Sequence, residues 1–397
     1  MKLNAIKYSR KEGEKAEWTL EGKPENGQYG QWCTFGDLNL IVGQNATGKT
    51  NTLKVIRELA DLLAGEAELP ELLYDTARYD IEFSTGGQKI AYAFKFKKAK
   101  VLEEKLFING ELFLDRDFGG VGKLRVDKNA GNLFEFKPSE NKLLALIIRE
   151  ALQLPLFEEL YQWGKSLTHY RFGDRMGKDT MAPIRDQDKE LDLKSASNAI
   201  AAFEKGRNSF GEPFIDTIKA DMEKMGYSLE EIGTAPLKRM NKRFNYSVGE
   251  YPMALFVKEA DINDTTDQSE MSQGLFRALS LLIQLNYSLF AKMPSCILID
   301  DIGEGLDYGR SKSLIELIIN KAKDSSVQLF MTTNDRFIMN KTSLEYWSII
   351  KREGQKSLFY NYRNSEQIFD DFELTGLSNF SFFSSNPITT RIRYNNG

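Results

Sequence analysis

Alternating polar and apolar residues dominate the N-terminal third of the chain. Residues 1–40 alternate with a period close to two and turn at glycines, which predicts antiparallel strands. From Tyr79 to Phe136 the same alternation is punctuated by Gly-Gly and Asn-Gly pairs, which favour tight hairpin turns. We therefore expect a meander of short antiparallel strands in this part.

A different pattern lies between these two stretches. Leu38–Gly43 is an apolar run that leads directly into a glycine-rich turn, and we expect a buried strand there. Apolar residues then recur at helical spacing from Thr50 to Leu63, which predicts an amphipathic helix.

The middle of the chain is expected to be mainly helical, in residues 139–170 and 188–235. Between them, Arg171–Asp188 is rich in Gly, Asp and Arg and is interpreted as an exposed loop. The last third alternates helices and strands, an order typical of α/β domains. The expected elements are helix Gln273–Phe290, strand Cys296–Asp300, helix Tyr308–Lys323, strand Val327–Thr332, and strands near Tyr346–Lys351 and Ser357–Tyr362.

Composition excludes several classes of protein. The 397 residues are 28% charged with a formal net charge of -4, which excludes a wholly basic surface that coats nucleic acid. Two cysteines, Cys33 and Cys296, cannot build a zinc cluster or a disulfide framework, and we expect both to be buried. The N-terminus is too charged for a signal peptide, and the longest apolar runs fall far short of the roughly 20 residues that span a bilayer. We expect a soluble, cytoplasmic protein with no membrane partner.

The strongest chemical signal is Gly43–Thr50 (GQNATGKT), which matches the pattern GxxxxGKT. Glycines allow the backbone to wrap around phosphates, and the N–H groups at a helix start hold the anion. Lys49 would neutralise the β- and γ-phosphates, and the Thr50 hydroxyl would ligate magnesium. Such a pattern can arise by chance, but the flanking strand and helix favour a phosphate-binding loop. The residues predicted to hold the nucleotide are Gly43, Asn45, Ala46, Thr47, Gly48, Lys49, Thr50 and Asn51.

Two further segments gain meaning beside this loop. The strand Cys296–Asp300 ends in a pair of carboxylates: Asp300 would bind the water shell of magnesium, and Asp301 would orient and deprotonate the attacking water. A serine and a glycine open the preceding helix, and this pairing again favours an anion. Alone, the first segment could be an ordinary acidic turn and the second a plain helix cap. The expected anion-binding residues of the second segment are Ser272, Gln273 and Gly274.

From about Leu38 to Asn334 the chain resembles the ATP-binding heads of the ABC-type family that includes RecF, the SMC-like heads and the OLD nucleases. The Walker A match is highly specific, and the other matches gain weight from their order and spacing. The long separation between Walker A and the signature is similar to members that insert a lobe there, and unlike compact transporter subunits. The matching segments are residues 43–50 for Walker A, Met271–Gly274 for the signature, 297–301 for Walker B, Gly305–Asp307 for the D-loop and Val327–Asn334 for the strand leading to the switch position.

The resemblance implies an α/β fold of the P-loop NTPase class, an ABC-type head with an antiparallel β lobe and an inserted helical lobe. It implies ATP and Mg2+ as cofactors, and a homodimer or higher oligomer in which Lys49 of one copy and Ser272 of the other clamp one nucleotide. Hydrolysis would then open the clamp. The implied parts are residues 1–138 and 261–397 for the two portions of the ATPase domain and 139–260 for the inserted lobe.

Two positions depart from the family's pattern. The residue after the Walker B aspartate is usually glutamate, and here it is the shorter Asp301, so we expect slow hydrolysis, with Glu304 as a weaker candidate for the same role. The switch residue is usually histidine, and here it is Asn334, which can hydrogen-bond a γ-phosphate but cannot share a positive charge. The one histidine, His169, is expected to be structural or at the surface, and no Q-loop glutamine is evident. The predicted catalytic residues are Lys49, Asp301 and Asn334.

The sequence says less about what the ATPase is for. The residues after Asp301 lack the spaced acidic cluster of an OLD-type nuclease, and a single histidine excludes histidine-based nuclease motifs. We expect an ATPase that controls a separate effector, as similar stand-alone ATPases do in bacterial anti-phage operons, and the aromatic tail Phe380–Gly397 is a candidate docking segment. A transporter ATPase fits less well.

The alternative is a RecF-like DNA-binding ATPase in DNA repair or clamp loading. Two groups of basic residues could contact DNA phosphates, although such groups also occur on any solvated face. The residues are Lys95, Lys97, Lys98 and Lys100, and farther on Lys238, Arg239, Lys242 and Arg243.

Overall fold

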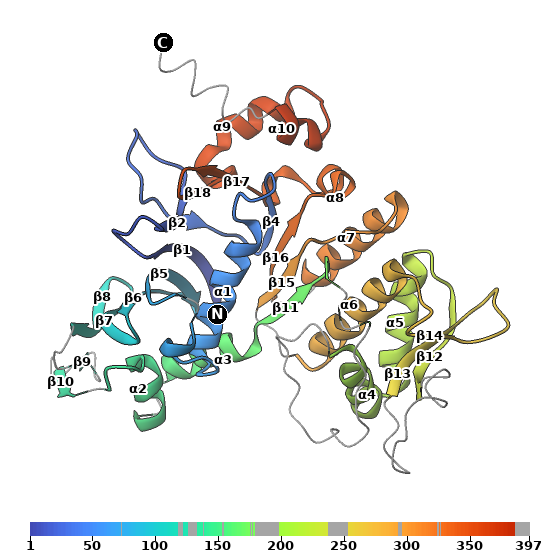
Figure 1. Cartoon of the computed structure of the whole chain (residues 1–397), viewed down its shortest axis with the longest axis horizontal. Coiled ribbons are helices and arrows are strands. Elements are labelled where there is room, and N and C mark those ends of the chain that lie inside the picture. Colours follow the sequence, from blue (N-terminus) through green and yellow to red (C-terminus); the bar gives the residue numbers. More distant parts are fainter. Residues whose placement is uncertain are drawn as a thin grey trace. The chain divides into compact units, whose positions relative to one another are not determined.

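The chain forms two compact units, Met1–Leu167 with Thr342–Gly397 (unit 1) and Thr168–Lys341 (unit 2). Figure 1 shows the elements of each. None of the helices described is long and apolar enough to cross a membrane. The computed structural model describes residues 1–72, 74–117, 122–125, 133–137, 139–152, 155–174, 176, 178, 198–236, 253–292, 296–323, 325 and 327–385.

The sheet of unit 1 joins the two ends of the chain. Its strand order is β10-β9-β8-β7-β6-β5-β1-β2-β18-β17-β4, and β3 pairs with β1. The pairs from β10 to β2 are antiparallel, which confirms the predicted meander, whereas β18 runs parallel to β2 and β17 parallel to β4. The strands are β1 (Lys2–Arg10), β2 (Trp18–Gly22), β3 (Cys33–Thr34), β4 (Leu38–Val42), β5 (Thr76–Thr85), β6 (Gln88–Lys97), β7 (Lys100–Ile108), β8 (Glu111–Asp117), β9 (Gly122–Arg125), β10 (Leu133–Phe136), β17 (Trp347–Glu353) and β18 (Lys356–Asn361).

Helices α1 and α3 of unit 1 pack closely against each other. A Cβ at Gly164 would lie 2.5 Å from the carbonyl oxygen of Ala60, so only glycine allows this approach. The predicted helix after the glycine-rich turn is therefore confirmed and has a defined partner. The helices are α1 (Lys49–Leu63), η1 (Leu69–Glu71), α2 (Leu144–Leu152), α3 (Pro155–Ser166), η4 (Leu344–Tyr346), α9 (Tyr362–Glu373) and α10 (Asn379–Ser385).

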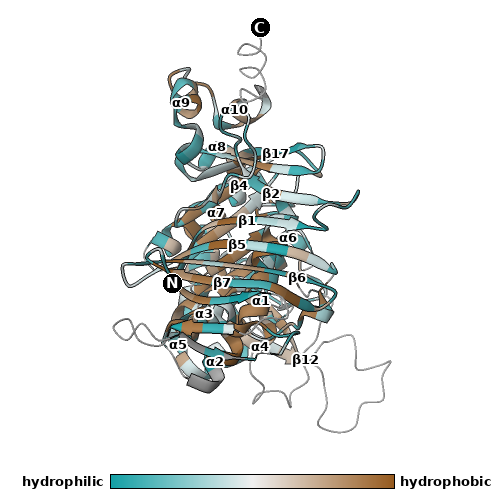
Figure 2. Cartoon of the chain, turned by 90° about the vertical axis from the view of Figure 1, so that its left-hand side faces the viewer, coloured by the Kyte–Doolittle hydropathy of each residue, from teal (hydrophilic) through white to brown (hydrophobic). Residues whose placement is uncertain are grey.

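The alternating sequence pattern gives the meander one buried face and one more exposed face. Every second residue of β6 is buried from Ile90 to Phe96, and apolar and polar segments succeed one another along these strands in Figure 2. The buried face carries aromatic contacts: Tyr79 stacks on Phe94 with ring centroids 4.8 Å apart, and Phe83 meets Trp163 of α3 at 4.9 Å. Large aromatic area on one face of the sheet anchors the helix that covers it.

The aromatic tail packs partly on its own chain. Phe382 in α10 is fully buried, with ring centroids 4.6 Å from Phe372 and 4.9 Å from Phe369. This residue therefore belongs to the core of unit 1 and is not available for docking. Residues 386–397, the rest of the expected docking segment, lie outside the described residues.

A buried carboxylate anchors the start of helix α2. Glu104 accepts hydrogen bonds from the backbone N–H groups of Leu144 (2.7 Å) and Ala145 (3.1 Å) and from the Tyr92 hydroxyl (2.7 Å), and Arg116 lies 3.4 Å away. A carboxylate at a helix N-terminus satisfies N–H groups that the helix itself leaves unpaired. Burial raises the pKa of Glu104, and these donors oppose the rise.

Unit 2 combines a parallel sheet segment with a small antiparallel sheet. β11 and β16 both run parallel to β15, and β13 lies between β12 and β14. Helix α6 packs on α4 and α5, where Phe210 and Phe214 contact Phe290. The elements are β11 (Thr168–Arg171), α4 (Ala199–Phe210), α5 (Glu212–Lys224), β12 (Leu229–Pro236), β13 (Met253–Glu259), β14 (Thr266–Asp267), α6 (Gln273–Phe290), β15 (Cys296–Asp300), α7 (Tyr308–Lys323), β16 (Gln328–Thr333) and α8 (Arg336–Lys341).

The predicted bounds of α6, β15 and α7 agree with the structure, whereas two strands in the middle were not predicted. β11 and β12 lie, except for the last residue of each, in the segments 139–170 and 188–235 that were expected to be mainly helical. β11 has four residues, too few to show a period, and its conformation is set by pairing with β15 more than a hundred residues later. The expected exposed loop after it also begins inside the unit, because Phe172 and Met176 are buried.

We predict that Glu104→Ala lowers the free energy of unfolding by about 3 kcal/mol, because it leaves Arg116 and the N-terminal amides of α2 buried without their acceptor. Glu103→Ala is the matched control: this neighbour is partly exposed and pairs with Arg78, and we expect a loss below about 1 kcal/mol. Urea denaturation of the full chain measures both. Equal losses would show that Glu104 is not the anchor of α2.

Candidate functional site

Strand β4 delivers the loop Gly43–Thr50 to the start of helix α1 in unit 1. All residues of β4 are buried, which holds the strand in the sheet. Gln44, Asn45 and Ala46 form the exposed tip of the loop. Gly48 is the N-cap residue of α1 with a φ of 115°, a conformation that residues with side chains rarely adopt. Sequence and geometry therefore agree on a glycine at this position.

Strand β18 supports the back of the loop. The Ser357 hydroxyl donates to the Thr47 carbonyl at 2.7 Å and accepts from the indole N–H of Trp18 at 3.1 Å. A Cβ at Gly48 would lie 2.6 Å from Ser357 Oγ, so the loop and the strand are in close contact. Sequence reasoning missed Ser357, because nothing near it in the sequence connects it with a loop some 300 residues earlier.

The side chain of Lys49 turns back into the loop. Its Nζ donates to the carbonyls of Gly43 at 2.8 Å and Gln44 at 3.1 Å, and the Thr47 hydroxyl also donates to Gln44 at 2.8 Å. The ammonium is thus held at the inner edge of the loop, where phosphate oxygens would replace the carbonyls as its partners. An ammonium, helix-start N–H groups and the Thr50 hydroxyl form a donor set that suits phosphates with magnesium.

Thr332 in unit 2 holds the carboxylate of Asp300 and the backbone of Asp301, the two predicted Walker B residues. Its hydroxyl donates to the carboxylate of Asp300 and accepts from the backbone N–H of Asp301 at 2.9 Å. The backbone N–H of Ile302 donates to the Thr332 carbonyl at 2.9 Å. Asp301 has a φ of 53°, so the chain turns sharply as it leaves β15. Thr332 was predicted only as a strand residue, and its contacts with the Asp300 carboxylate and the Asp301 backbone come from the pairing of β15 with β16.

A glycine after β11 lies beside Asp301 and Glu304. A Cβ at Gly173 would lie 2.7 Å from Glu304 Oε2 and 3.3 Å from Asp301 Oδ2. Both carboxylates therefore face one point that only a residue without a side chain can occupy. Sequence reasoning missed Gly173 because the strand that delivers it was not recognised. The same geometry keeps Glu304 as a candidate beside Asp301.

The signature helix begins close to the predicted D-loop. The hydroxyl of Ser272 accepts from the Leu275 N–H at 3.2 Å and caps α6, and Ser272 is itself exposed. A Cβ at Gly274 would lie 3.3 Å from the Gly305 carbonyl and 3.2 Å from Leu306 Cδ2. Unit 2 thus brings the signature and the segment after Walker B into contact, while Gln273 lies at the helix start between Ser272 and Gly274.

The switch position lies at the end of β16. Asn334 is exposed and directly precedes Asp335, whose carboxylate accepts from the Phe337 N–H at 2.6 Å and caps α8. The Thr333 hydroxyl donates to the Ile302 carbonyl at 2.9 Å, which ties this end of β16 to the turn after Walker B. The end of β16 is therefore connected to the Walker B carboxylates through the backbone.

The remaining candidate residues have structural positions. Cys33 and Cys296 are buried as expected, and burial raises the pKa of both thiols. His169 is buried in β11, so of the two expectations for it only the structural one agrees with the fold. Its neighbour Tyr170 is buried as well.

The basic residues of the meander are partly neutralised. Lys95 pairs with Glu12 at 2.5 Å, and Lys100 pairs with Glu140 at 2.8 Å. These contacts lower the positive charge available for DNA phosphates. The second basic group, Lys238, Arg239, Lys242 and Arg243, lies outside the described residues.

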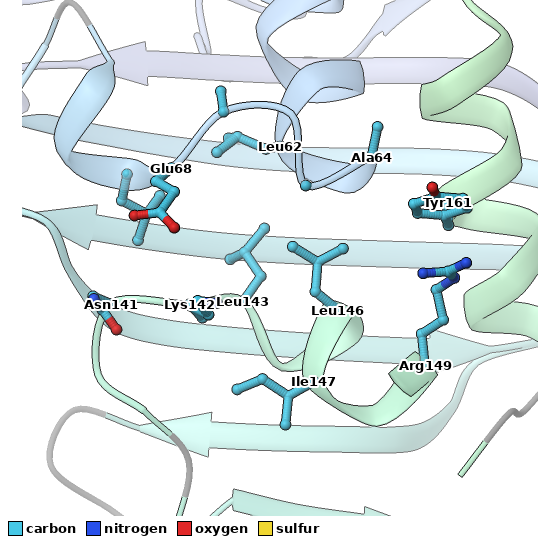
Figure 3. Close-up of a pocket in the computed structure, with 13 residues that line it drawn as sticks. Leu62, Ala64, Glu68, Asn141, Lys142, Leu143, Leu146, Ile147, Arg149 and Tyr161 are labelled. Atoms are coloured by element: carbon cyan, nitrogen blue, oxygen red, sulfur yellow. The ribbon is translucent and has the colours of Figure 1, made fainter. Parts of the chain in front are cut away.

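A separate cavity of about 240 Å³ lies in unit 1 between the C-terminal end of α1, α2 and α3 (Figure 3). Leu62, Leu143 and Leu146 are among its apolar lining residues. At one side Arg149 stacks 3.4 Å over the ring of Tyr161. Helix α1 rises about 1.5 Å per residue, so the cavity and the phosphate loop lie at opposite ends of the helix.

Fold and motifs together define an ABC-type ATPase head of the SMC- and RecF-like kind. The family described as "AAA domain, putative AbiEii toxin, Type IV TA system" matches residues 38–340, and the chain belongs to this family. No curated protein matches the chain.

Two solved structures are similar to the chain. An SMC head bound to the C-winged helix domain of ScpA is similar over 92% of this chain and 99% of that chain, with 14% identity and a TM-score of 0.53. An SMC head domain from Thermotoga maritima aligns over 91% of this chain and 99% of that chain, with 13% identity and a TM-score of 0.42. The first match confirms the predicted fold class.

We predict that Ser357→Ala weakens ATP binding by about 10-fold, because the Thr47 carbonyl loses the donor that holds the back of the loop. Ser348→Ala is the matched control, since it removes a buried hydroxyl from the adjacent strand β17 and leaves the Ser357–Thr47 contact intact. Equilibrium binding of a fluorescent ATP analogue measures both. Wild-type affinity in Ser357→Ala would show that the loop holds its shape without this hydrogen bond.

Proposed function

We propose that this chain binds and hydrolyses ATP at an interface between two copies of itself and uses the resulting switch to control a separate effector protein. The observation that carries the proposal is the loop Gly43–Thr50. It has an exposed tip, a buried lysine whose ammonium is held by the loop's own carbonyls, and a glycine N-cap at the start of a helix. This arrangement supports phosphate binding.

Each residue has a role in the proposed chemistry. Lys49 binds the β- and γ-phosphates, with the backbone of Gly43, Asn45, Ala46, Thr47, Gly48 and Asn51 around them. Thr50 and Asp300 are the groups that would hold magnesium, which neutralises charge on the transferred phosphoryl group. Asp301 orients the attacking water and takes its proton, and Asn334 donates a hydrogen bond to the γ-phosphate.

Hydrolysis is proposed to be slow. Asp301 is one methylene shorter than glutamate, and its backbone is held at a φ of 53° by the turn after β15. Glu304 lies close to the same point at Gly173 as Asp301 and is a second carboxylate near the proposed water. A slow ATPase suits a switch, because the bound state then persists long enough for an effector to respond.

Self-association is proposed through the signature. Ser272 is exposed and caps the start of α6, and Gly274 leaves the helix N-terminus unobstructed by a side chain. A helix start with exposed donors is suited to the γ-phosphate of a nucleotide held by the partner copy. A head-to-tail homodimer uses this surface twice.

The effector is proposed to be a separate protein in a defence system against phage. The family description names a toxin of a toxin–antitoxin system, and this supports a defence role over a role in DNA repair. The similar SMC head is bound to a domain of another protein, ScpA, which supports the idea that a head of this fold can engage a separate partner. The ion pairs at Lys95 and Lys100 give the DNA-binding alternative no support.

We predict that ATP with magnesium increases the oligomeric mass of the wild type, and that Lys49→Ala abolishes both this shift and phosphate release. Lys54→Ala, at an exposed position of the same helix α1, is the control and keeps both. Light scattering after size exclusion and a phosphate-release assay measure the two quantities. A mass and a turnover that ignore both ATP and Lys49→Ala would refute the proposed function.

We predict that Asp301→Asn lowers the rate of phosphate release at least 100-fold while ATP still binds, because the amide cannot accept the proton of the attacking water. Glu304→Gln, in the same turn, is expected to lower it less than about 10-fold. The comparison assigns the base, since the reverse order of effects would identify Glu304 as the residue that takes the proton.

A further inference from the structure

Arg277 connects two loops of unit 2 to the signature helix. From α6, its guanidinium donates to the carbonyls of Gly173 at 2.7 Å, Asp174 at 2.9 Å and Glu304 at 2.9 Å. Two of these carbonyls belong to the loop after β11, and the third belongs to the turn after Walker B. One side chain therefore joins three segments that are far apart in the sequence.

Two glycines make room for this arrangement. A Cβ at Gly305 would lie 2.9 Å from Arg277 Nη1, and the φ of Gly305 is 80°. Gly274, one turn before Arg277 on the same helix, lies close to the Gly305 carbonyl. The helix start, the guanidinium and the turn are thus in direct contact.

The guanidinium contacts the segments that place both carboxylates. Glu304 itself supplies one of the three carbonyls, and the Gly173 position lies beside Asp301 Oδ2 and Glu304 Oε2. A shift of Arg277 therefore changes the distance between the loop after β11 and the two carboxylates.

Arginine has the donor geometry that these three contacts use, one bond each from Nε, Nη1 and Nη2. Its planar guanidinium presents five N–H groups in a fixed fork, whereas lysine has a compact ammonium on a flexible stem. The three carbonyls are contacted by three separate nitrogens of the planar guanidinium, a spacing that the single nitrogen of an ammonium does not reproduce. Replacement by lysine keeps the positive charge and removes the planar arrangement of N–H donors. The variant therefore separates the effect of the charge from the effect of the donor geometry.

We propose that Arg277 is a positioning residue that couples the signature to the Walker B carboxylates of the same chain. The inference rests on the proposed function, in which Ser272 contacts the nucleotide of the partner copy while Asp301 acts on the chain's own nucleotide. An anion at the start of α6 moves this helix end, and Arg277, about one turn along, passes the movement to the Glu304 and Gly173 carbonyls. Nucleotide binding at one site of the dimer then changes the positions of the Asp301 and Glu304 carboxylates at the other site.

The test compares Arg277→Lys with the wild type and with Arg207→Lys, a surface arginine of α4 that pairs with Glu204. The measured quantities are the Kd for ATP, the kcat and KM for phosphate release, and the Hill coefficient. For Arg277→Lys we expect a Kd within about 2-fold of wild type, a kcat lowered about 10- to 100-fold because the carboxylates are misplaced, and a Hill coefficient that falls from above 1 to about 1. Arg207→Lys should match the wild type in every quantity.

Gly305→Ala provides a second variant, because its Cβ would displace Arg277 while the arginine remains. We expect the same loss of kcat and cooperativity, and a double variant no worse than either single one. Thermal denaturation checks that each variant is folded. Wild-type kcat and cooperativity in both single variants would overturn the inference, as would a wild type that hydrolyses ATP without cooperativity. A wild type that does not bind ATP would refute the proposed function itself, so the two failures are distinguishable.

Discussion

The phosphate loop keeps its shape because strands from the far end of the chain lie against it. A Cβ at Gly43 would lie 2.5 Å from Ile350 Cγ2 in β17, and Ser357 in β18 donates to the Thr47 carbonyl. A loop that must wrap phosphates is built from glycines and is entropically costly to order. Contacts from a well-packed sheet supply the order that the loop lacks on its own. The N-terminal motif is therefore incomplete without the C-terminal strands.

In unit 2, polar side chains from other elements order the turn that follows β15. The turn after β15 carries Asp301 in a left-handed conformation and is rich in glycine, so it has little intrinsic preference for one shape. Thr332 holds its first residues from β16, and Arg277 holds Glu304 from α6. Thr332 lies on a strand and Arg277 on a helix, so the direction of each hydrogen bond is fixed by regular secondary structure. The backbone that carries Asp301 and Glu304 thereby acquires a defined position, which a catalytic role would require.

Local pattern was reliable where each element carries its own period. Helix Gln273–Phe290 and strand Cys296–Asp300 have strong apolar patterns and were predicted with their bounds, and the hairpin pairs of the meander followed from alternation and turn residues. β11 and the burial of Phe382 were not predicted, for one shared reason. A four-residue strand and an aromatic tail both take their place from partners distant in the sequence.

The sequence alone determined the class of fold, the predicted phosphate loop, the acidic pair after β15 and the helix that begins at Ser272. Each of these follows from a pattern of residues that are close together in the sequence. Tertiary structure decided which other residues serve them. Ser357, Gly173 and Arg277 carry no motif, and their roles arise only from strand pairing and helix packing that bring distant backbone groups within hydrogen-bond reach. Such contacts depend on spatial proximity, which a one-dimensional pattern does not contain.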